Sequence, residues 1–231
     1  MRYAEIVWRC ALLAALVAGT SGCAFFNGIL NAFNSSRTPA SASAVAPAQS
    51  TATAAAAAPV EAPVSLVVHR AFDESGRALR AGRIAEAERG FRALVQSNPE
   101  LGGPHANLGL IDRQAGKLAE AAGELEQAVR LSPRQPVFQN QLGITYRQQG
   151  QFDKARDAYE KAIALDPAYA APYLNLGILH DLYFNDGRRA LELYDRYLAL
   201  SPGGDATVTK WVAELKNRKA GTTTASRKEK T

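Results

Sequence analysis

The sequence predicts an all-α protein, a row of helical hairpins that follows an N-terminal export signal and a low-complexity linker. Pro99, Pro133 and Pro167 are 34 residues apart, and Pro202 follows after 35. A self-similarity with a fixed period of roughly 20–50 residues indicates a repeat array. The first part of the chain is instead dominated by apolar and small residues, so the chain divides into two unlike regions.

The net charge of +5 comes from the C-terminal tail. From residue 216 onward one acidic residue, Glu229, stands against six basic ones: Lys216, Arg218, Lys219, Arg227, Lys228 and Lys230. No basic face spreads over the repeat region, so a nucleic-acid partner is not expected. Short basic tails are usually solvated. A weak contact with anionic lipid head groups or an anionic envelope polymer is the alternative.

Residues 1–22 have the layout of a secretory signal peptide. Arg2 and Arg9 make the first nine residues positively charged. Residues 10–19 then form a short apolar run, and the small residues Ser21 and Gly22 follow. The run is shorter than the ~20 apolar residues that a membrane-spanning helix needs. We therefore expect an export signal.

The segment from Thr20 to Cys23 resembles the lipobox of bacterial lipoproteins. This resemblance implies that Cys23 is lipidated and becomes the first residue of the mature protein. Several acyl chains hold a protein stably on a membrane, whereas one chain does so only marginally. Ala24 stands where an Asp would resemble an inner-membrane retention signal, so we expect an outer-membrane anchor that faces the periplasm. The alternative is an ordinary secretory signal with an incidental cysteine.

Residues 23–65 combine the predicted lipidated cysteine with a linker rich in Ala, Ser, Thr and Pro. Few large apolar residues follow Phe33, so this segment cannot build a core. Cys10 and Cys23 both precede the repeats. We therefore expect a disordered tether and a repeat domain without disulfides.

Alignment on the prolines divides the next region into four units, 68–101, 102–135, 136–169 and 170–204. Three of the units share a Leu-Gly pair: Leu108-Gly109, Leu142-Gly143 and Leu176-Gly177. All four have a glycine at the expected turn: Gly82, Gly116, Gly150 and Gly187. An alanine column follows: Ala87, Ala121, Ala155 and Ala190. Four residues further on comes a column of large side chains: Phe91, Leu125, Tyr159 and Tyr194.

These columns resemble the tetratricopeptide repeat closely across residues 102–202. The first unit resembles it less, because Glu74-Ser75 replaces the Leu-Gly pair. Glycine inside a helix costs roughly 0.8–1.0 kcal/mol relative to alanine, so we expect the two helices of each hairpin to approach closely at the glycines. The resemblance implies a solenoid whose first helices line a concave groove for a peptide or protein partner.

A further helix is expected over residues 205–219. Gly203 and Gly204 break the preceding helix, and Asp205 suits an N-cap. An apolar set then recurs at helical spacing: Val208, Trp211, Val212 and Leu215. This helix should cap the last hairpin, and we expect residues 220–231 to be a disordered basic tail.

Three columns are candidates for contacts in the groove. The first carries amides that pair with any peptide backbone, or that merely belong to the repeat pattern: Asn107, Gln141 and Asn175. The second is expected to leave an exposed apolar stripe, unless the capping helix or the tether covers it: Leu110, Ile144 and Ile178. In the third, Arg113 and Arg147 either bind carboxylates or are solvated. Asp181 interrupts this column in the fourth unit.

No catalytic site, metal site or cofactor is expected. His69, His105 and His180 fall in different units, and none has a Cys or His at metal-ligand spacing. No local motif suggests a nucleophile with its base, and the glycines form no phosphate-binding loop.

The sequence therefore favours a non-catalytic scaffold or assembly factor of the bacterial envelope. Similar repeat lipoproteins serve as pilotins and assembly factors, which suggests pilus, secretion or polysaccharide-export machinery as the partner. A periplasmic adaptor that recruits a cell-wall enzyme is the alternative. A third alternative, a cytosolic co-chaperone, would require that the N-terminal 23 residues are not an export signal.

Overall fold

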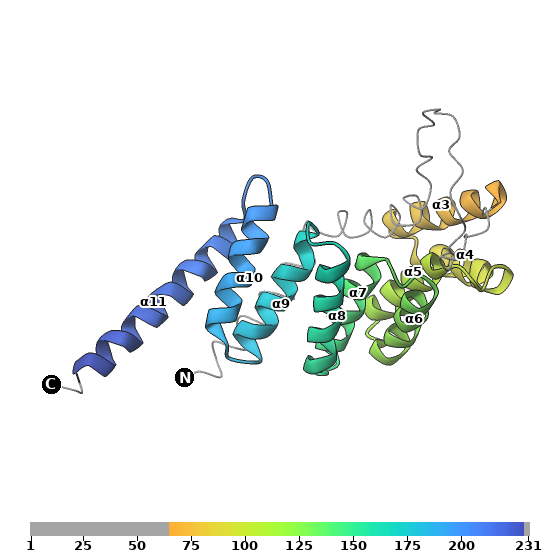
Figure 1. Cartoon of the computed structure of the whole chain (residues 1–231). Coiled ribbons are helices and arrows are strands. Elements are labelled where there is room, and N and C mark those ends of the chain that lie inside the picture. Colours follow the sequence, from red (N-terminus) through yellow and green to blue (C-terminus); the bar gives the residue numbers. More distant parts are fainter. Residues whose placement is uncertain (1–64, 229–231) are drawn as a thin grey trace, which may run out of the picture.

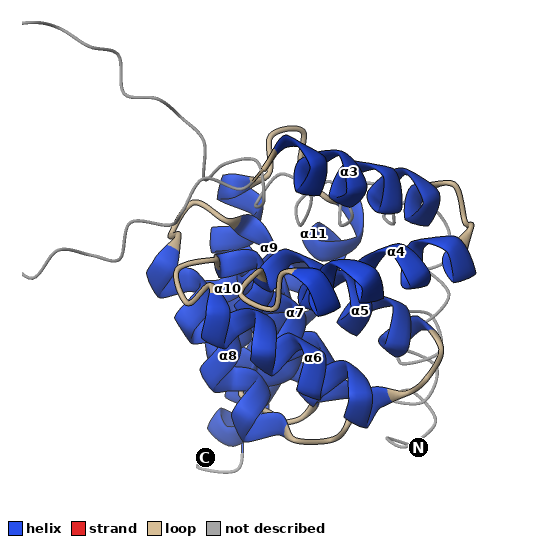
Figure 2. Ribbon diagram, turned by 90° about the vertical axis from the view of Figure 1, so that its right-hand side faces the viewer, coloured by secondary structure: helices blue, strands red, loops and turns tan. Residues whose placement is uncertain are grey.

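The computed structural model describes residues 65–228, with side chains for residues 65–218, and every regular element in this part is a helix (Figures 1 and 2). The helices are α3 (Leu66–Arg80), α4 (Ile84–Ser97), α5 (Gly102–Gln114), α6 (Leu118–Leu131), α7 (Pro136–Gln148), α8 (Phe152–Leu165), α9 (Ala170–Leu182), α10 (Gly187–Leu200) and α11 (Ala206–Lys228). Consecutive pairs form hairpins that stack in chain order (Figure 1). The predicted all-α solenoid is confirmed. The predicted signal peptide, Cys23 and nearly all of the linker lie outside the described residues.

Glycines in the left-handed conformation make the first three hairpin turns. Gly82, Gly116 and Gly150 have φ of 74°, 77° and 75°. In the first turn the next residue, Arg83, donates its backbone N–H to the carbonyl of Ala78 at 2.9 Å, which closes the end of the helix. A side chain at φ near +75° is strained, so these turns favour glycine.

The fourth turn differs from the prediction. Gly187 begins α10, and Asn185 takes the left-handed conformation with φ of 52°. Asparagine tolerates this region better than most residues. The extra residue of the fourth unit therefore shifts the left-handed position onto Asn185, while the Asp186 side chain caps α10 by accepting from the backbone N–H of Arg189.

Within each of the last three hairpins, a glycine on the first helix receives a large side chain from the second. A Cβ at Gly143 would lie 2.6 Å from Cε1 of Tyr159, and a Cβ at Gly177 would lie 2.6 Å from Cε1 of Tyr194. Gly109 meets Leu125 in the same way, at 2.7 Å from its Cγ. The expected close approach of the two helices at these glycines is present.

The first hairpin reverses this arrangement. Ser75 occupies the glycine position on α3, and the glycine lies on the opposite helix, at Gly90 of α4. A Cβ at Gly90 would collide with Oγ of Ser75. The two helices still approach closely, with the small residue moved to the other side of the contact.

The first helices of successive hairpins contact one another, α5 with α7 and α7 with α9, whereas α4, α6 and α8 make no comparably extensive contacts among themselves. The odd-numbered helices therefore form the inner, tighter side of the curved array. We call α5, α7 and α9 the inner layer.

α11 caps the last hairpin, as predicted. Asp205 accepts from the backbone N–H groups of Thr207 and Val208 at 2.9 and 3.1 Å, which begins the helix. The apolar side of α11 packs on Ile178 and Tyr194. The helix continues to Lys228, beyond residue 219 where a disordered tail was expected to begin. The segment 219–228 contains no proline to end a helix.

Candidate functional site

The predicted amide column lies inside the inner layer rather than on an open surface. Asn107 and Gln141 are 0% exposed. Asn107 donates to the carbonyl of Gly103 on its own helix at 2.9 Å, while its Oδ1 accepts no hydrogen bond from the described residues. Both amide atoms of Gln141 also lack a partner there. Buried polar atoms without a partner are rare and cost about 1–3 kcal/mol each.

Asn175 has a structural partner. Its Nδ2 donates to Oδ1 of Asn140 at 3.0 Å, and Nδ2 of Asn140 lies 3.2 Å from the hydroxyl of Tyr169. This chain of amides joins α9 to α7 and is complete by itself. Asn140 and Tyr169 were not singled out from the sequence, since neither belongs to a repeating column.

The prediction that Leu110, Ile144 and Ile178 form an exposed apolar stripe is wrong for two of its three members. Leu110 is 3% exposed and packs with Phe138 of the next hairpin. Ile178 is 4% exposed and lies beneath α11. Ile144 is half-buried. The column faces the following hairpin, where its side chains complete the core between units.

The two arginines of the third column lie close together. Arg113 reaches from α5 to α7 and donates from Nη1 to the main-chain carbonyl of Gln141 at 3.3 Å. Burial lowers the pKa of the Arg113 guanidinium to about 10; Tyr159 opposes this shift and the positive charge of Arg147 adds to it. The third-column side chain of the fourth unit, Asp181, instead binds Arg218 of α11 at 3.0 Å.

Tyr159 completes this cluster, although the sequence suggested only a packing role for it. Its side chain is 0% exposed, and burial raises the pKa of its hydroxyl against the opposing charges of Arg147 and Arg113. The side chain of Arg147 lies within hydrogen-bonding reach of this hydroxyl and lowers its pKa, although neither the hydroxyl nor Nε of Arg147 has a hydrogen bond of standard geometry among the described residues. The sequence did contain one sign of a polar role: Tyr159 stands where the second unit has Leu125. A buried tyrosine hydroxyl usually has a polar partner, so a polar group was to be expected near it. We call Arg113, Arg147 and Tyr159 the arginine–tyrosine cluster.

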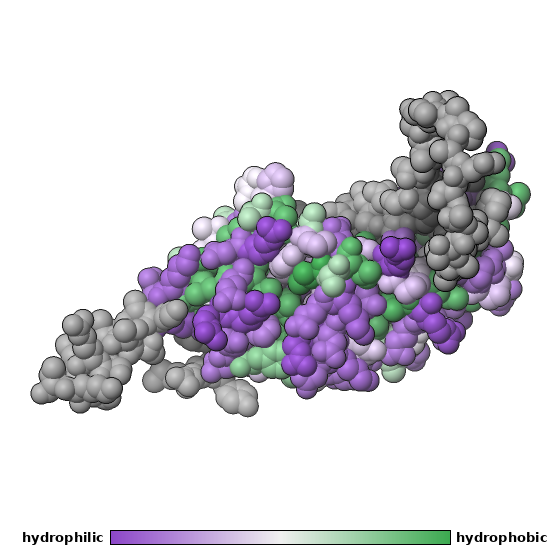
Figure 3. All heavy atoms as spheres, viewed as in Figure 1, coloured by the Kyte–Doolittle hydropathy of each residue, from purple (hydrophilic) through white to green (hydrophobic). Residues whose placement is uncertain are grey.

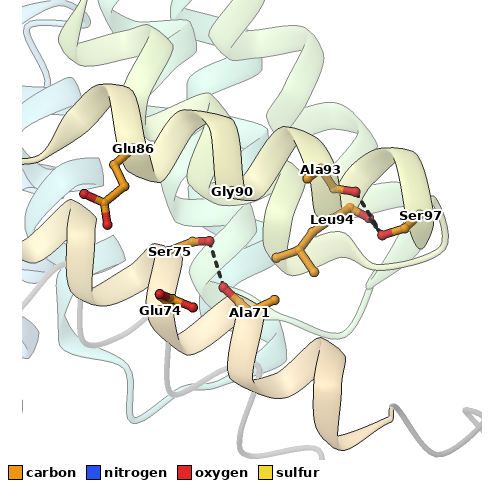
Figure 4. A pocket seen from close by; sticks show the side chains of 8 residues that line it. All are labelled: Ala71, Glu74, Ser75, Glu86, Gly90, Ala93, Leu94 and Ser97. Carbon is orange, nitrogen blue, oxygen red and sulfur yellow. Dashed lines mark hydrogen bonds between the residues drawn. The ribbon is translucent and has the colours of Figure 1, made fainter.

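A separate pocket of about 270 Å³ lies between α3 and α4 (Figure 4). Small side chains line it, and Glu74 and Glu86 stand at its walls. Within it, Ser75 donates to the carbonyl of Ala71 at 2.8 Å. The pocket follows from the reversed small residues of the first hairpin, and it contains none of the predicted groove residues.

Other classes of site are not found in the described part of the chain. No group of three or more His, Cys, Asp and Glu side chains there has an arrangement that could hold a metal ion. None of the described helices combines the length and the apolar character needed to cross a membrane. The face shown in Figure 3 is mostly hydrophilic, with smaller hydrophobic areas between.

Two models of repeat families match the chain. A model described as a tetratricopeptide repeat matches residues 73–136, and a model described as a TPR repeat matches residues 143–182. The helical hairpins described above occupy both ranges. The folded part is a tetratricopeptide-repeat solenoid. A comparison of the sequence with curated proteins found no match.

Solved structures share this fold. PilF of Pseudomonas aeruginosa is similar with a TM-score of 0.61 and 19% identity, over 67% of this chain and 69% of PilF. MamA of Desulfovibrio magneticus RS-1 is similar with a TM-score of 0.59 and 20% identity, over 71% of this chain and 91% of that one. Another MamA structure gives 0.58 and 22%, over 66% and 82%. At these identities the likeness concerns the fold alone.

Proposed function

We propose that this solenoid is a non-catalytic scaffold that holds a peptide or protein segment along its inner layer. Tetratricopeptide repeats are typical protein-binding modules, and the described residues provide no alternative such as a metal group. The observation that carries the proposal is Gln141. Its amide lies in the middle of the inner layer with both donor and acceptor unpaired.

A partner backbone can supply what Gln141 lacks. An amide side chain pairs with one backbone N–H and one backbone C=O whatever the partner's side chains are. Arg113 donates to the main-chain carbonyl of Gln141 over 3.3 Å, so a segment that pairs with the Gln141 amide would lie beside Arg113. Ile144, one turn further along α7 and half-buried, then offers an apolar contact.

The test separates binding from folding. Gln141→Leu has nearly the same volume and removes an unpaired buried amide, so it should stabilise the fold by about 1–3 kcal/mol while weakening capture of the partner. A photoreactive residue at Gln148, exposed on α7, should crosslink the partner in intact cells, whereas one at Lys161, exposed on α8, should not. Equal crosslinking from both positions, undiminished by Gln141→Leu, would contradict the proposal.

We further propose that the scaffold is anchored in the outer membrane through Cys23 and faces the periplasm, where it serves pilus, secretion or polysaccharide-export machinery. The small residues that precede Cys23 support the anchor. Cys23→Ala should abolish palmitate incorporation and release the protein from the membrane fraction. Unchanged labelling and fractionation would contradict the anchor. A crosslinked cell-wall enzyme in place of assembly machinery would favour an adaptor.

A further inference from the structure

The first hairpin has a face that no preceding unit covers. In the second hairpin Leu108 of α5 packs with Leu94 of α4, and in the fourth Tyr173 of α9 packs with Tyr159 of α8. Among the described helices, α3 makes extensive contacts with α4 alone, because the description begins at Ser65. Hairpins in a repeat array are stabilised by covering one another. Whatever covers this face therefore comes from residues 1–64 or from another molecule.

The pocket between α3 and α4 lies on this face. It exists because two columns that hold larger residues in the other units hold Ala71 and Gly90 here. The larger pairs in the same columns are His105 with Glu124, Gln139 with Ala158, and Tyr173 with Leu193. The volume of about 270 Å³ is below the range of roughly 300–1,000 Å³ that is usual for small-molecule sites. The pocket therefore suits inserted side chains rather than a whole small molecule.

The pocket has an acidic end and an apolar end (Figure 4). Glu74 and Glu86 line it towards the hairpin turn, and Leu94 lines it at the other end. Val67, one turn before Ala71 on the same side of α3, is 73% exposed and extends the apolar end. Glu74 stands where the other units have the leucine of the Leu-Gly pair, and it forms no ion pair with a described residue. An apolar segment with a positive charge at one end would match this surface.

The same chain contains a segment with that pattern, residues 25–37. Its apolar residues recur at helical spacing: Phe25, Phe26, Ile29, Leu30 and Phe33. Arg37 follows one helical turn after Phe33, and it is the only charged residue between Arg9 and Glu61. A helix over this range would carry its single charge at one end of the apolar stripe.

We propose that residues 25–37 dock as a helix in the groove between α3 and α4, in the place that a preceding hairpin takes on each later unit. Phe33 then fills the space beside Ala71, and Arg37 lies near Glu74. That position is roughly 14 Å from Ser65 along α3. Residues 38–64 span roughly 26–31 Å root-mean-square as a coil, so the connection is long enough.

Docking changes how the domain is attached. The segment begins two residues after Cys23. With the anchor proposed above, the first hairpin is held at the membrane surface instead of at the end of a long tether, and the other hairpins extend from it. The docking itself requires neither the lipid nor a partner in the inner layer.

Hydrogen exchange of the purified full chain in mild detergent measures the docking. The amides of residues 25–37 should exchange at least about tenfold more slowly than those of residues 40–60, relative to their intrinsic rates. Ala71→Leu fills the groove with a residue smaller than the tyrosine of its column, Tyr173, and should abolish this protection. Ala85→Leu, exposed elsewhere on α4, should retain it. Absent protection would overturn the proposal. So would protection that survives Ala71→Leu, because it would assign the segment to the detergent or lipid.

Crosslinking identifies the occupant of the groove. A photoreactive residue at Ala93, exposed at the edge of the groove, should crosslink residues 25–37 of the same chain, whereas one at Ala85 should not. Crosslinks from Ala93 to a second copy or to another protein, in place of this segment, would overturn the proposal.

Charge reversal tests the placement of Arg37. Arg37→Glu should reduce the protection of residues 25–37 about two- to fivefold, the range for an exposed ion pair. Glu74→Arg in the same chain should restore it. Asp73→Arg, at the neighbouring exposed carboxylate that does not line the groove, should not. Equal rescue by both changes would overturn the proposed placement.

Discussion

The contact between Gly143 and Tyr159 gives a sharp prediction about stability. In Gly143→Ala the new Cβ would lie 2.6 Å from Cε1 and 2.7 Å from Cδ1 of a rigid ring that is 0% exposed. Alanine gains about 0.8–1.0 kcal/mol of helix propensity over glycine. Overpacking a buried contact costs about 1–3 kcal/mol. The two effects oppose each other, so we expect a net loss in the free energy of unfolding of between about 0 and 2 kcal/mol.

Gly123 supplies the matched control. It lies in the middle of α6, is exposed, and has no atom within 4 Å of the position its Cβ would take. Gly123→Ala should therefore show the propensity gain alone, about 0.8–1.0 kcal/mol. Urea denaturation followed by far-ultraviolet circular dichroism compares the two variants with the wild type. If Gly143→Ala stabilises the protein as much as Gly123→Ala does, the ring moves away without cost and the packing argument is refuted.

Two other predictions concern charge and the capping helix. Burial raises the pKa of Asp112 above its usual value of 3.8, although Lys117 partly opposes this. The pKa of Asp112 is higher in the folded state than in the unfolded state, so the fold loses stability as the pH rises from about 3.8 through the folded pKa, and the loss is complete above it. Asp112→Asn should therefore raise the urea midpoint at pH 7 and have no effect below pH 3.8. A lower midpoint at pH 7 would contradict this. Val212 lies on the packed side of α11 and is 7% exposed. Val212→Asp should lower the stability of the protein by several kcal/mol and alter Trp211 fluorescence, whereas Ala213→Asp, next to it and exposed, should change little. Equal effects of the two would show that α11 is not packed on α10.

The sequence was sufficient to predict the hairpins, because their causes are local or repeat with a fixed period. Proline and the turn glycines mark the breaks, and the large residue four places beyond each alanine marks the contact with a helical glycine. The cap of α11 was likewise visible in Asp205. The left-handed Asn185 was not, since an inserted residue lets a turn close in more than one way.

The direction in which each column faces could not be read from the period. Residues one repeat apart occupy equivalent places on successive helices, but the rotation between hairpins decides whether those places open to the groove or meet the next unit. Leu110 and Ile178 are apolar at equivalent positions because each completes an interface, with α7 and with α11 respectively. The amides and arginines were found in sequence as columns, yet their unpaired atoms depend on packing that only the structure supplies.

Two neighbouring positions on α7 show how structural and functional demands differ. At Gly143 the residue found is also the one that packing requires, because only glycine leaves room for the ring of Tyr159. At Gln141 they disagree, because a leucine of similar volume would fill the same buried position without leaving two amide atoms unpaired. A polar group held at a cost is explained if another molecule completes its hydrogen bonds.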